Sequence, residues 1–246
     1  MDTAVHSPRA VDSNTQSGAV RADTWLTFGL AFVGGYGDAA GFVLASTFTG
    51  HVTGNLVLTA IAVAGRDWRA TAEHFLAIAA FFAGVFLSEL MARARKPRSS
   101  LPLLAMVMGA EIVLIAVAYR TLESHSAFRL ELFVSCVSLA LGMQNGALRR
   151  AGGINIHTTY LTGMMTNLVA ARTDRYLSRI TLQPAPAADP GIALLCGIGA
   201  AFVLGAATGA AMIFHFRSAG ILGAAAVLFG LVVLLLIGRP REYSVG

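Results

Sequence analysis

The sequence has 246 residues, of which 56% are hydrophobic and only 13% are charged, with a formal net charge of +5 and a mean hydropathy of +0.68. An ordinary soluble domain has about 25% charged residues, so this chain has too few to cover a surface that faces water. We therefore expect an all-α integral membrane protein. The basic residues lie between apolar runs and form no stripe with aromatic residues, so no nucleic acid is expected as a partner.

The first 24 residues lack the apolar stretch of about 7–15 residues that a secretory signal peptide contains. They are predicted to form a disordered cytoplasmic tail. A single membrane domain is expected over residues 25–238, followed by a second cytoplasmic tail at residues 239–246.

Six apolar runs are long enough to cross a bilayer as helices, which takes about 20 residues. They cover roughly residues 25–46, 71–92, 101–119, 127–148, 191–214 and 218–238. Two further runs, 51–65 and about 158–171, are shorter and begin with polar residues. We expect these two to be re-entrant or half-helical segments, whose irregular backbone is tolerated at membrane depth only where protein or water covers it.

The distribution of lysine and arginine decides between six and eight crossings. With six crossings and the N-terminus inside, 13 of the 18 basic residues lie on the inner side. With eight crossings, the basic cluster at residues 93–98 and the two termini lie on opposite sides. The positive-inside rule therefore predicts six spans in a bacterial inner membrane, with both termini in the cytoplasm.

A weak internal repeat divides the membrane domain into two halves, about 25–119 and 127–238. Asp38 aligns with Asn145, and the threonine–glycine pairs at the heads of the two short segments coincide. Each half contains three long spans, which is an odd number, so the second half is predicted to be inverted relative to the first. Helical periodicity alone can produce part of this similarity.

Paired short segments in two inverted halves are the best sequence indication of a transporter binding site. The residues concerned are Thr53, Gly54 and Asn55 in the first half and Thr162, Gly163 and Asn167 in the second. Their backbone amides and helix dipoles would face a ligand. Because small and hydroxylated residues also pack helices together in lipid, helix packing is the alternative interpretation.

Asp38 follows the glycine-rich stretch GGYG inside the first span and is the first candidate for ion or solute binding. A charge at membrane depth costs about 3 kcal/mol, so such residues usually serve ions, protons or substrates. A buried carboxyl group can titrate near neutral pH, which makes Asp38 a candidate for proton coupling. The alternative is a cap or interhelical hydrogen bond at a kink that the glycines favour.

Five other polar positions complete the candidate site. Gln144 and Asn145 end the fourth span, where Asn145 mirrors the aspartate of the first half but cannot exchange a proton. Glu111 lies in the middle of the third span and belongs to no motif. His51 and His157 flank the short segments, and each is either a proton relay or ligand contact or an amphipathic residue at the interface.

No sequence pattern indicates catalysis. Neither HExxH, nor GxSxG, nor a phosphate-binding glycine loop, nor a Cys–His pair at metal spacing occurs. Both cysteines, Cys136 and Cys196, lie in apolar runs. We therefore expect no enzyme, no metal site and no cofactor.

Two motif regions, GYGDAAGFVLASTFTGHVTGNLV and LALGMQNGALRRAGGINIHTTYLTGMMTNLV, resemble the YoaK-like family of bacterial membrane proteins. That family has a glycine–aspartate motif in its first span, a threonine–glycine–asparagine motif after it, and motifs like GMQNG and TTYLTG in its second half. The resemblance extends over about residues 25–238. It implies an inner-membrane protein of about six spans, and it leaves the activity open.

These patterns together predict a secondary transporter or permease for a small solute, with proton coupling as one form of it. The alternative is a non-transporting sensor or partner protein whose polar motifs hold the bundle together. The expected partners are the lipid bilayer and an unknown small solute. The oligomeric state is left open, a homo-oligomer included.

Overall fold

The computed structural model describes residues 13–94, 101–151, 161–181 and 190–237. Over these residues the chain forms only helices, eight of them α-helical and one 3₁₀, so the all-helical prediction is confirmed there. The elements are α1 (Ser13–Ala45), α2 (Val52–Ala64), α3 (Trp68–Ala94), α4 (Leu101–Leu122), α5 (Arg129–Ala151), α6 (Leu161–Ile180), α7 (Pro190–Phe216), η1 (Arg217–Ile221) and α8 (Leu222–Ile237).

Each of the six predicted long spans overlaps one long helix, namely α1, α3, α4, α5, α7 or α8. The apolar part of α1 begins at Thr24, close to the predicted start. The helix itself begins at Ser13, inside the predicted tail. Residues 13–23 contain no proline and only a single glycine, so the helix continues through them.

Four stretches of the described chain are long and apolar enough to cross a membrane: Thr24–Ala45, Trp68–Ala94, Leu103–Leu122 and Leu194–Ile237. The last stretch contains two helices, α7 and α8, which meet at η1. Helix α5 is not among them, because charged residues near both ends and a polar pair near its C-terminus lower its hydropathy. Its middle is nevertheless buried among the other helices.

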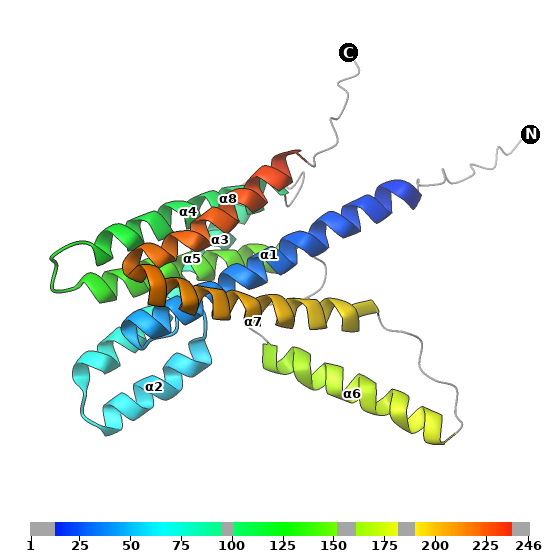
Figure 1. Cartoon of the computed structure of the whole chain (residues 1–246), viewed down its shortest axis with the longest axis horizontal. Coiled ribbons are helices and arrows are strands. Elements are labelled where there is room, and N and C mark those ends of the chain that lie inside the picture. Colours follow the sequence, from blue (N-terminus) through cyan, green and yellow to red (C-terminus); the bar gives the residue numbers. More distant parts are fainter. Residues whose placement is uncertain (1–12, 95–100, 152–160, 182–189, 238–246) are drawn as a thin grey trace, which may run out of the picture.

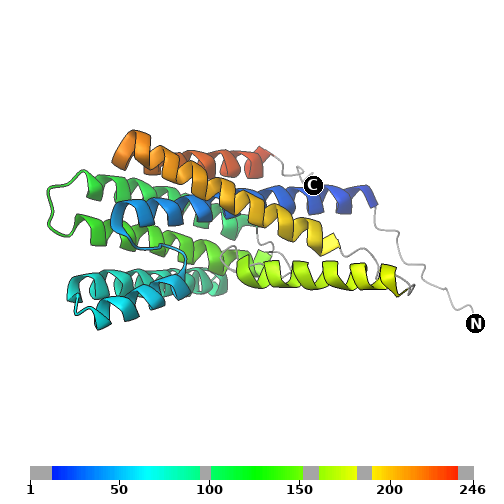
Figure 2. The same ribbon diagram turned by 60° about the horizontal axis from the view of Figure 1, so that its bottom comes forward.

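The long helices lie roughly side by side (Figures 1 and 2). The α2–α3, α4–α5 and α7–α8 connections gather at one end of the bundle, which we call the turn end. The N-terminus of α1 and the C-termini of α3, α5 and α8 lie toward the other end, which we call the terminal end. Helices α1 and α5 therefore run in opposite directions, as do α3 and α7, and also α4 and α8.

Helix α2 occupies only the half of the bundle nearest the turn end (Figures 1 and 2). Its 13 residues span about 20 Å, which is short of a hydrocarbon core of about 30 Å. Ser46, with φ of 52°, has the left-handed conformation that ends α1 and lets the chain turn back before α2 begins. The C-termini of α1 and α2 thus lie toward the same end.

Helix α6 is longer than the short segment predicted at 158–171, because it continues through residues 172–180. These residues are polar but compatible with a helix, so a search for apolar runs misses them. In contrast to α2, α6 extends away from the bundle beyond the terminal end, and it packs mainly against α7 (Figure 1).

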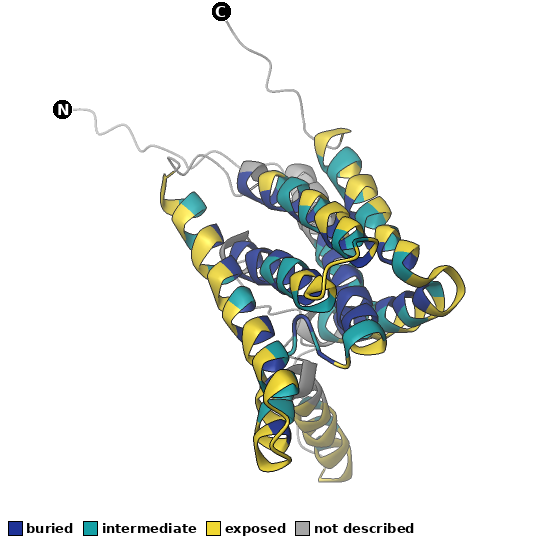
Figure 3. Cartoon of the chain, turned by 90° about the vertical axis from the view of Figure 1, so that its left-hand side faces the viewer, coloured by how far each residue is buried: buried dark blue, intermediate teal, exposed yellow. Residues whose placement is uncertain are grey.

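Buried residues lie where helices face one another, and exposed residues cover the outside (Figure 3). The core contains large apolar side chains such as Leu30, Tyr36 and Phe133. Large apolar side chains also cover the outer faces, Phe82 and Phe86 of α3 among them. Such an apolar exterior suits contact with lipid rather than water.

Glycines allow α1 and α7 to touch through their backbones. Gly35 of α1 lies against the backbone oxygen of Phe202, and Gly205 of α7 lies against that of Phe32. A β-carbon at either glycine would collide with the facing oxygen. Small residues allow this close approach at helix contacts in membranes.

Helices α3 and α5 are joined in the same way. Gly142 of α5 lies against the backbone oxygen of Phe81, and Gly84 of α3 lies against that of Leu139. Gly142 follows Gly35 by 107 residues, the same offset that relates Asn145 to Asp38. One glycine of each contact, Gly35 or Gly142, therefore lies at a corresponding position of the two predicted halves.

Candidate functional site

The carboxylate of Asp38 binds the loop that precedes α2. One oxygen, Oδ1, accepts hydrogen bonds from the backbone amides of Thr49 (3.0 Å) and Gly50 (2.6 Å). The other oxygen, Oδ2, pairs with Nδ1 of His51. Asp38 is only 4% exposed, and hydrogen bonds to an ionised acceptor are among the strong ones in proteins. The loop thus supplies the charge compensation that a buried carboxylate requires.

Asn55 fixes the same loop from the first turn of α2. Its Oδ1 accepts a hydrogen bond from the amide of Phe48 (3.0 Å), and its Nδ2 donates one to the carbonyl of Phe48 (2.6 Å). Gly54 leaves room for the ring of Phe48, whose nearest atom would lie 3.0 Å from an added β-carbon. The side chain of Thr53 is exposed. The threonine–glycine–asparagine motif therefore acts on the loop through its glycine and asparagine.

A second buried polar contact, between Thr47 and His74 of α3, was not among the predicted site residues. Thr47 Oγ1 lies 3.0 Å from Nδ1 of His74, and both residues are buried. The sequence carries one signal for it, a histidine next to Glu73 near the start of the second predicted span. This contact ties the start of the loop to α3.

His51 lies at the edge of this cluster. Its ring is 5.6 Å from the ring of Phe48 and 5.6 Å from that of Phe202 on α7. Its side chain remains 35% exposed, whereas that of Asp38 is only 5% exposed. The ion pair is therefore accessible on its histidine side, and a bound molecule would meet His51 first.

Gln144 and Asn145 are buried on α5. Gln144 Nε2 donates a hydrogen bond to the carbonyl of Leu30 on α1 (3.0 Å). Leu30 precedes Asp38 by eight residues, which is about 12 Å along the helix. Asn145 Nδ2 donates to the carbonyl of Leu141 one turn earlier (2.8 Å). Gln144 therefore joins the two halves of the chain at a distance from the Asp38 loop.

The structure describes little of the predicted site in the second half. Gly163 lies in the first turn of α6 and is half-buried. The side chains of Thr162 and Asn167, and all of His157, lie outside the described residues. Whether these residues meet the loop at Asp38 stays a prediction.

Glu111 lies in α4, away from the loop. It is 0% exposed, and neither carboxyl oxygen has a hydrogen-bond partner in the described part of the chain. The two predicted acids therefore differ in their partners. Both oxygens of Asp38 are hydrogen-bonded, whereas neither oxygen of Glu111 has a partner among the described residues.

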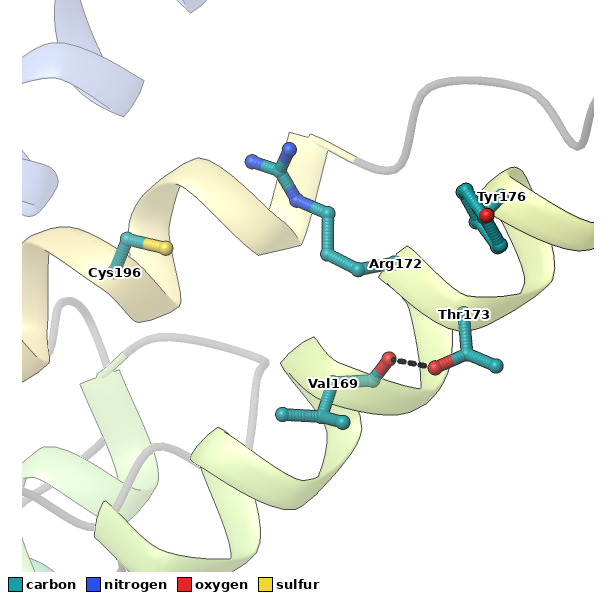
Figure 4. Close-up of a pocket in the computed structure, with 5 residues that line it drawn as sticks. All are labelled: Val169, Arg172, Thr173, Tyr176 and Cys196. Atoms are coloured by element: carbon teal, nitrogen blue, oxygen red, sulfur yellow. Dashed lines mark hydrogen bonds between the residues drawn. The ribbon is translucent and has the colours of Figure 1, made fainter.

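A pocket of about 570 Å³ lies between α6 and α7 (Figure 4). The side chain of Arg172 extends from α6 toward α7, and Cys196 belongs to the facing part of α7. Thr173 Oγ1 donates within its own helix to the carbonyl of Val169 (2.9 Å). Among the predicted site residues whose side chains the structure describes, none lines this pocket.

Residues 26–235 match the model of a family described as "Protein of unknown function (DUF1275)". The chain belongs to the DUF1275 family. It is also 27% identical over 143 residues to the UPF0700 transmembrane protein YoaK of Bacillus subtilis (strain 168). This match covers 57% of the chain and 63% of YoaK. No solved structure gives a significant match.

These similarities confirm the resemblance to YoaK-like proteins, and they agree with the apolar helices in indicating a membrane protein. A family of unknown function assigns no chemistry to this DUF1275 protein. In the described residues, no group of three or more His, Cys, Asp or Glu side chains is placed to hold a metal ion. What the site offers is a buried carboxylate, two backbone amides that donate to it and an accessible histidine.

Proposed function

We propose that this DUF1275 protein is a secondary transporter or permease for a small solute. The observation that carries the proposal is the interrupted passage through α1, residues 46–51 and α2. A loop with buried polar groups turns back inside the bundle, and a half-length helix then begins within it. Interrupted helices of this kind hold the substrate and the coupling ion in many secondary transporters.

The arrangement of the helices supports an inverted repeat of residues 25–119 and 127–238. Corresponding helices of the two halves run in opposite directions (Figure 1). Gly35, in the contact of α1 with α7, corresponds in sequence offset to Gly142, in the contact of α5 with α3. Such repeats place a binding site at the interface of two halves that move relative to each other.

We place the solute at the exposed side of His51, next to the N-terminus of α2. The amides of Thr49 and Gly50 point at the Asp38 carboxylate, as amides before a helix point at a bound anion. A solute that reaches His51 competes for this pairing and changes the position of the loop. The polar residues of the second half, including Gly163, form the corresponding part of the site in this proposal.

We place the protein in a bacterial inner membrane with both termini in the cytoplasm. The basic residues at the C-terminus of α3, together with those at the end of α5 and in α6, belong to helix segments toward the terminal end. Such an excess of positive charge is typical of the cytoplasmic side.

Transport is tested with purified protein in liposomes that enclose a pH-sensitive dye. Inorganic anions, monocarboxylates, amino acids and sugars are added in turn, with solute-induced current recorded on a supported membrane in parallel. At least one class is expected to produce a current or a change in luminal pH, and the His51→Ala variant is expected to reduce it. If the folded protein moves none of these classes, it is not a transporter of this kind.

The hydrogen bonds of Asp38 and Asn55 also fit the second candidate, a sensor or partner protein whose polar motifs are structural. Side-specific thiol labelling addresses the structural basis of the choice, in a background without Cys136 and Cys196. Single cysteines at Ser46 and Asp67 are expected to react from the periplasmic side only. Labelling from opposite sides would make α2 a true crossing and remove the main support for the transporter.

A further inference from the structure

The carboxyl group of Glu111 lies at mid-depth in the bundle. Glu111 is the eleventh of the 22 residues of α4, a helix packed against α5, α8 and η1 and, more sparsely, against α3. The neighbours one turn away on α4 are apolar, and Val107, Met108 and Ile115 are themselves buried. The carboxyl group is thus enclosed by apolar side chains of its own helix and by the packed helices.

In the helices that pack against α4, as far as the structure describes them, no charged group lies at the depth of Glu111. Helix α8 has no titratable residue, and on α4 the first are Tyr119 and Arg120, about 12 Å further along the helix. The titratable residues of the other packed elements are Arg69, Glu73, His74, Glu89 and Arg93 on α3, Arg129, Glu131, Cys136, Arg149 and Arg150 on α5, and Arg217 on η1. Most of these lie near helix ends, and between Glu131 and Arg149 the only one is Cys136.

The environment determines the charge of the carboxyl group. Burial of an unpaired ion costs far more free energy, even after the protein relaxes, than burial of a neutral polar group that lacks a hydrogen bond. Since both oxygens of Glu111 are buried and have no hydrogen-bond partner among the described residues, this environment favours the protonated acid.

We propose that Glu111 is a proton-binding site, which holds its proton while α4 is packed against α5 and α8 and releases it when this packing opens. The proposal rests on the proposed transport function, to which it adds the coupling ion and the group that binds it. Asp38 does not carry out this role, because the amides of Thr49 and Gly50 and the ring of His51 already satisfy its carboxylate. Protonation and helix packing are linked, since a ligand that binds one conformation shifts the equilibrium toward it.

Infrared spectroscopy tests the proton directly. Reconstituted protein is compared with the variants Glu111→Gln and Asp38→Asn, and with wild-type protein that contains carboxyl-labelled ¹³C-glutamate. The C=O stretching band of a protonated carboxylic acid is expected in the wild type. It shifts in the labelled protein, is absent from Glu111→Gln and persists in Asp38→Asn. A wild-type spectrum without such a band, or one unchanged by the label, would show that Glu111 is ionised and overturn the proposal.

Hydrogen exchange tests the link between the proton and the packing. The exchange rate of α4 and α8 amides in the wild type is divided by the rate in Glu111→Gln at the same pH. Above the pH at which Glu111 titrates in the open conformation, this ratio is expected to increase by up to about tenfold per pH unit. Each unit favours the open, deprotonated conformation over the packed, protonated one by 1.36 kcal/mol. Glu111→Leu, which also has no proton to release, is the control and should match Glu111→Gln.

A ratio that stays constant over the whole pH range would refute the coupling, whatever the transport assay shows. Neither measurement requires a substrate, so failure of the transport function and failure of the proton site are distinguishable. If transport is observed and the ratio is constant, the transport proposal stands and the proton site at Glu111 is refuted. If the ratio rises and no transport is observed, the proton site stands and the transport proposal is refuted.

Discussion

Replacement of Asp38 by alanine tests whether this carboxylate builds the loop or is free to bind a solute. The variant leaves the buried amides of Thr49 and Gly50 without an acceptor and His51 without its ionic partner. Each buried donor that loses its partner costs about 1–3 kcal/mol, so the two amides cost about 2–6 kcal/mol. The loss at His51 adds little, because this side chain is partly exposed.

Two milder variants separate these contributions. Asp38→Asn keeps one oxygen for both amides but removes the charge, which weakens each hydrogen bond by about 1 kcal/mol and gives a total of about 2 kcal/mol. His51→Ala removes only the partly exposed partner, and we expect it to cost less than about 1 kcal/mol. The expected loss of stability is therefore largest for Asp38→Ala, smaller for Asp38→Asn and smallest for His51→Ala.

The assay is hydrogen exchange of the individual amides in reconstituted protein. A local loss of 2 kcal/mol or more in Asp38→Ala corresponds to exchange about 30-fold faster, or more, at Thr49 and Gly50. Amides in the middle of α3 serve as the internal reference and should change much less. Unchanged exchange at Thr49 and Gly50 would refute the structural role, and the carboxylate would then be available to a solute.

Three further predictions concern packing and the loop. Gly142→Ala should lower stability by about 1–3 kcal/mol in thermal unfolding, because the added β-carbon collides with the facing helix. Gly109→Ala, where the added β-carbon meets open space, should be neutral or gain up to about 1 kcal/mol. Equal melting temperatures of the two variants would contradict the close contact. Asn55→Ala should lower stability by about 2 kcal/mol, because it unpairs the two backbone groups of Phe48. A loss of less than about 0.5 kcal/mol, which is what we expect for Thr53→Ala, would argue against the two hydrogen bonds between Asn55 and Phe48. Thr47→Val should cost about 1 kcal/mol and change the NMR shifts of the imidazole that it contacts, and an unaltered imidazole would disprove that contact.

Helix positions followed closely from the sequence because the length of an apolar run is itself the physical requirement for crossing a bilayer. The predicted span at 71–92 corresponds to α3, Trp68–Ala94, and the span at 101–119 corresponds to α4, Leu101–Leu122. Helix α5 was also found by its apolar middle, although its polar ends lower its average hydropathy. The predicted extent of α6 was wrong. Its C-terminal half is polar, so a search for apolar runs does not find it.

The partners of the site residues were not predictable in the same way. The sequence singles out Asp38 because a charged residue is rare inside a span. It does not show which amides bind it, because nearly every residue carries an amide and only the fold of the loop selects Thr49 and Gly50. The contact between Thr47 and His74 joins residues 27 positions apart for the same reason.

The two glycine contacts have a consequence for how this chain assembles. The α1–α7 contact and the α3–α5 contact each take one helix from the first half and one from the second. A chain cut between α4 and α5 therefore separates both pairs, and we expect its two fragments to reach the folded bundle only when they are expressed together.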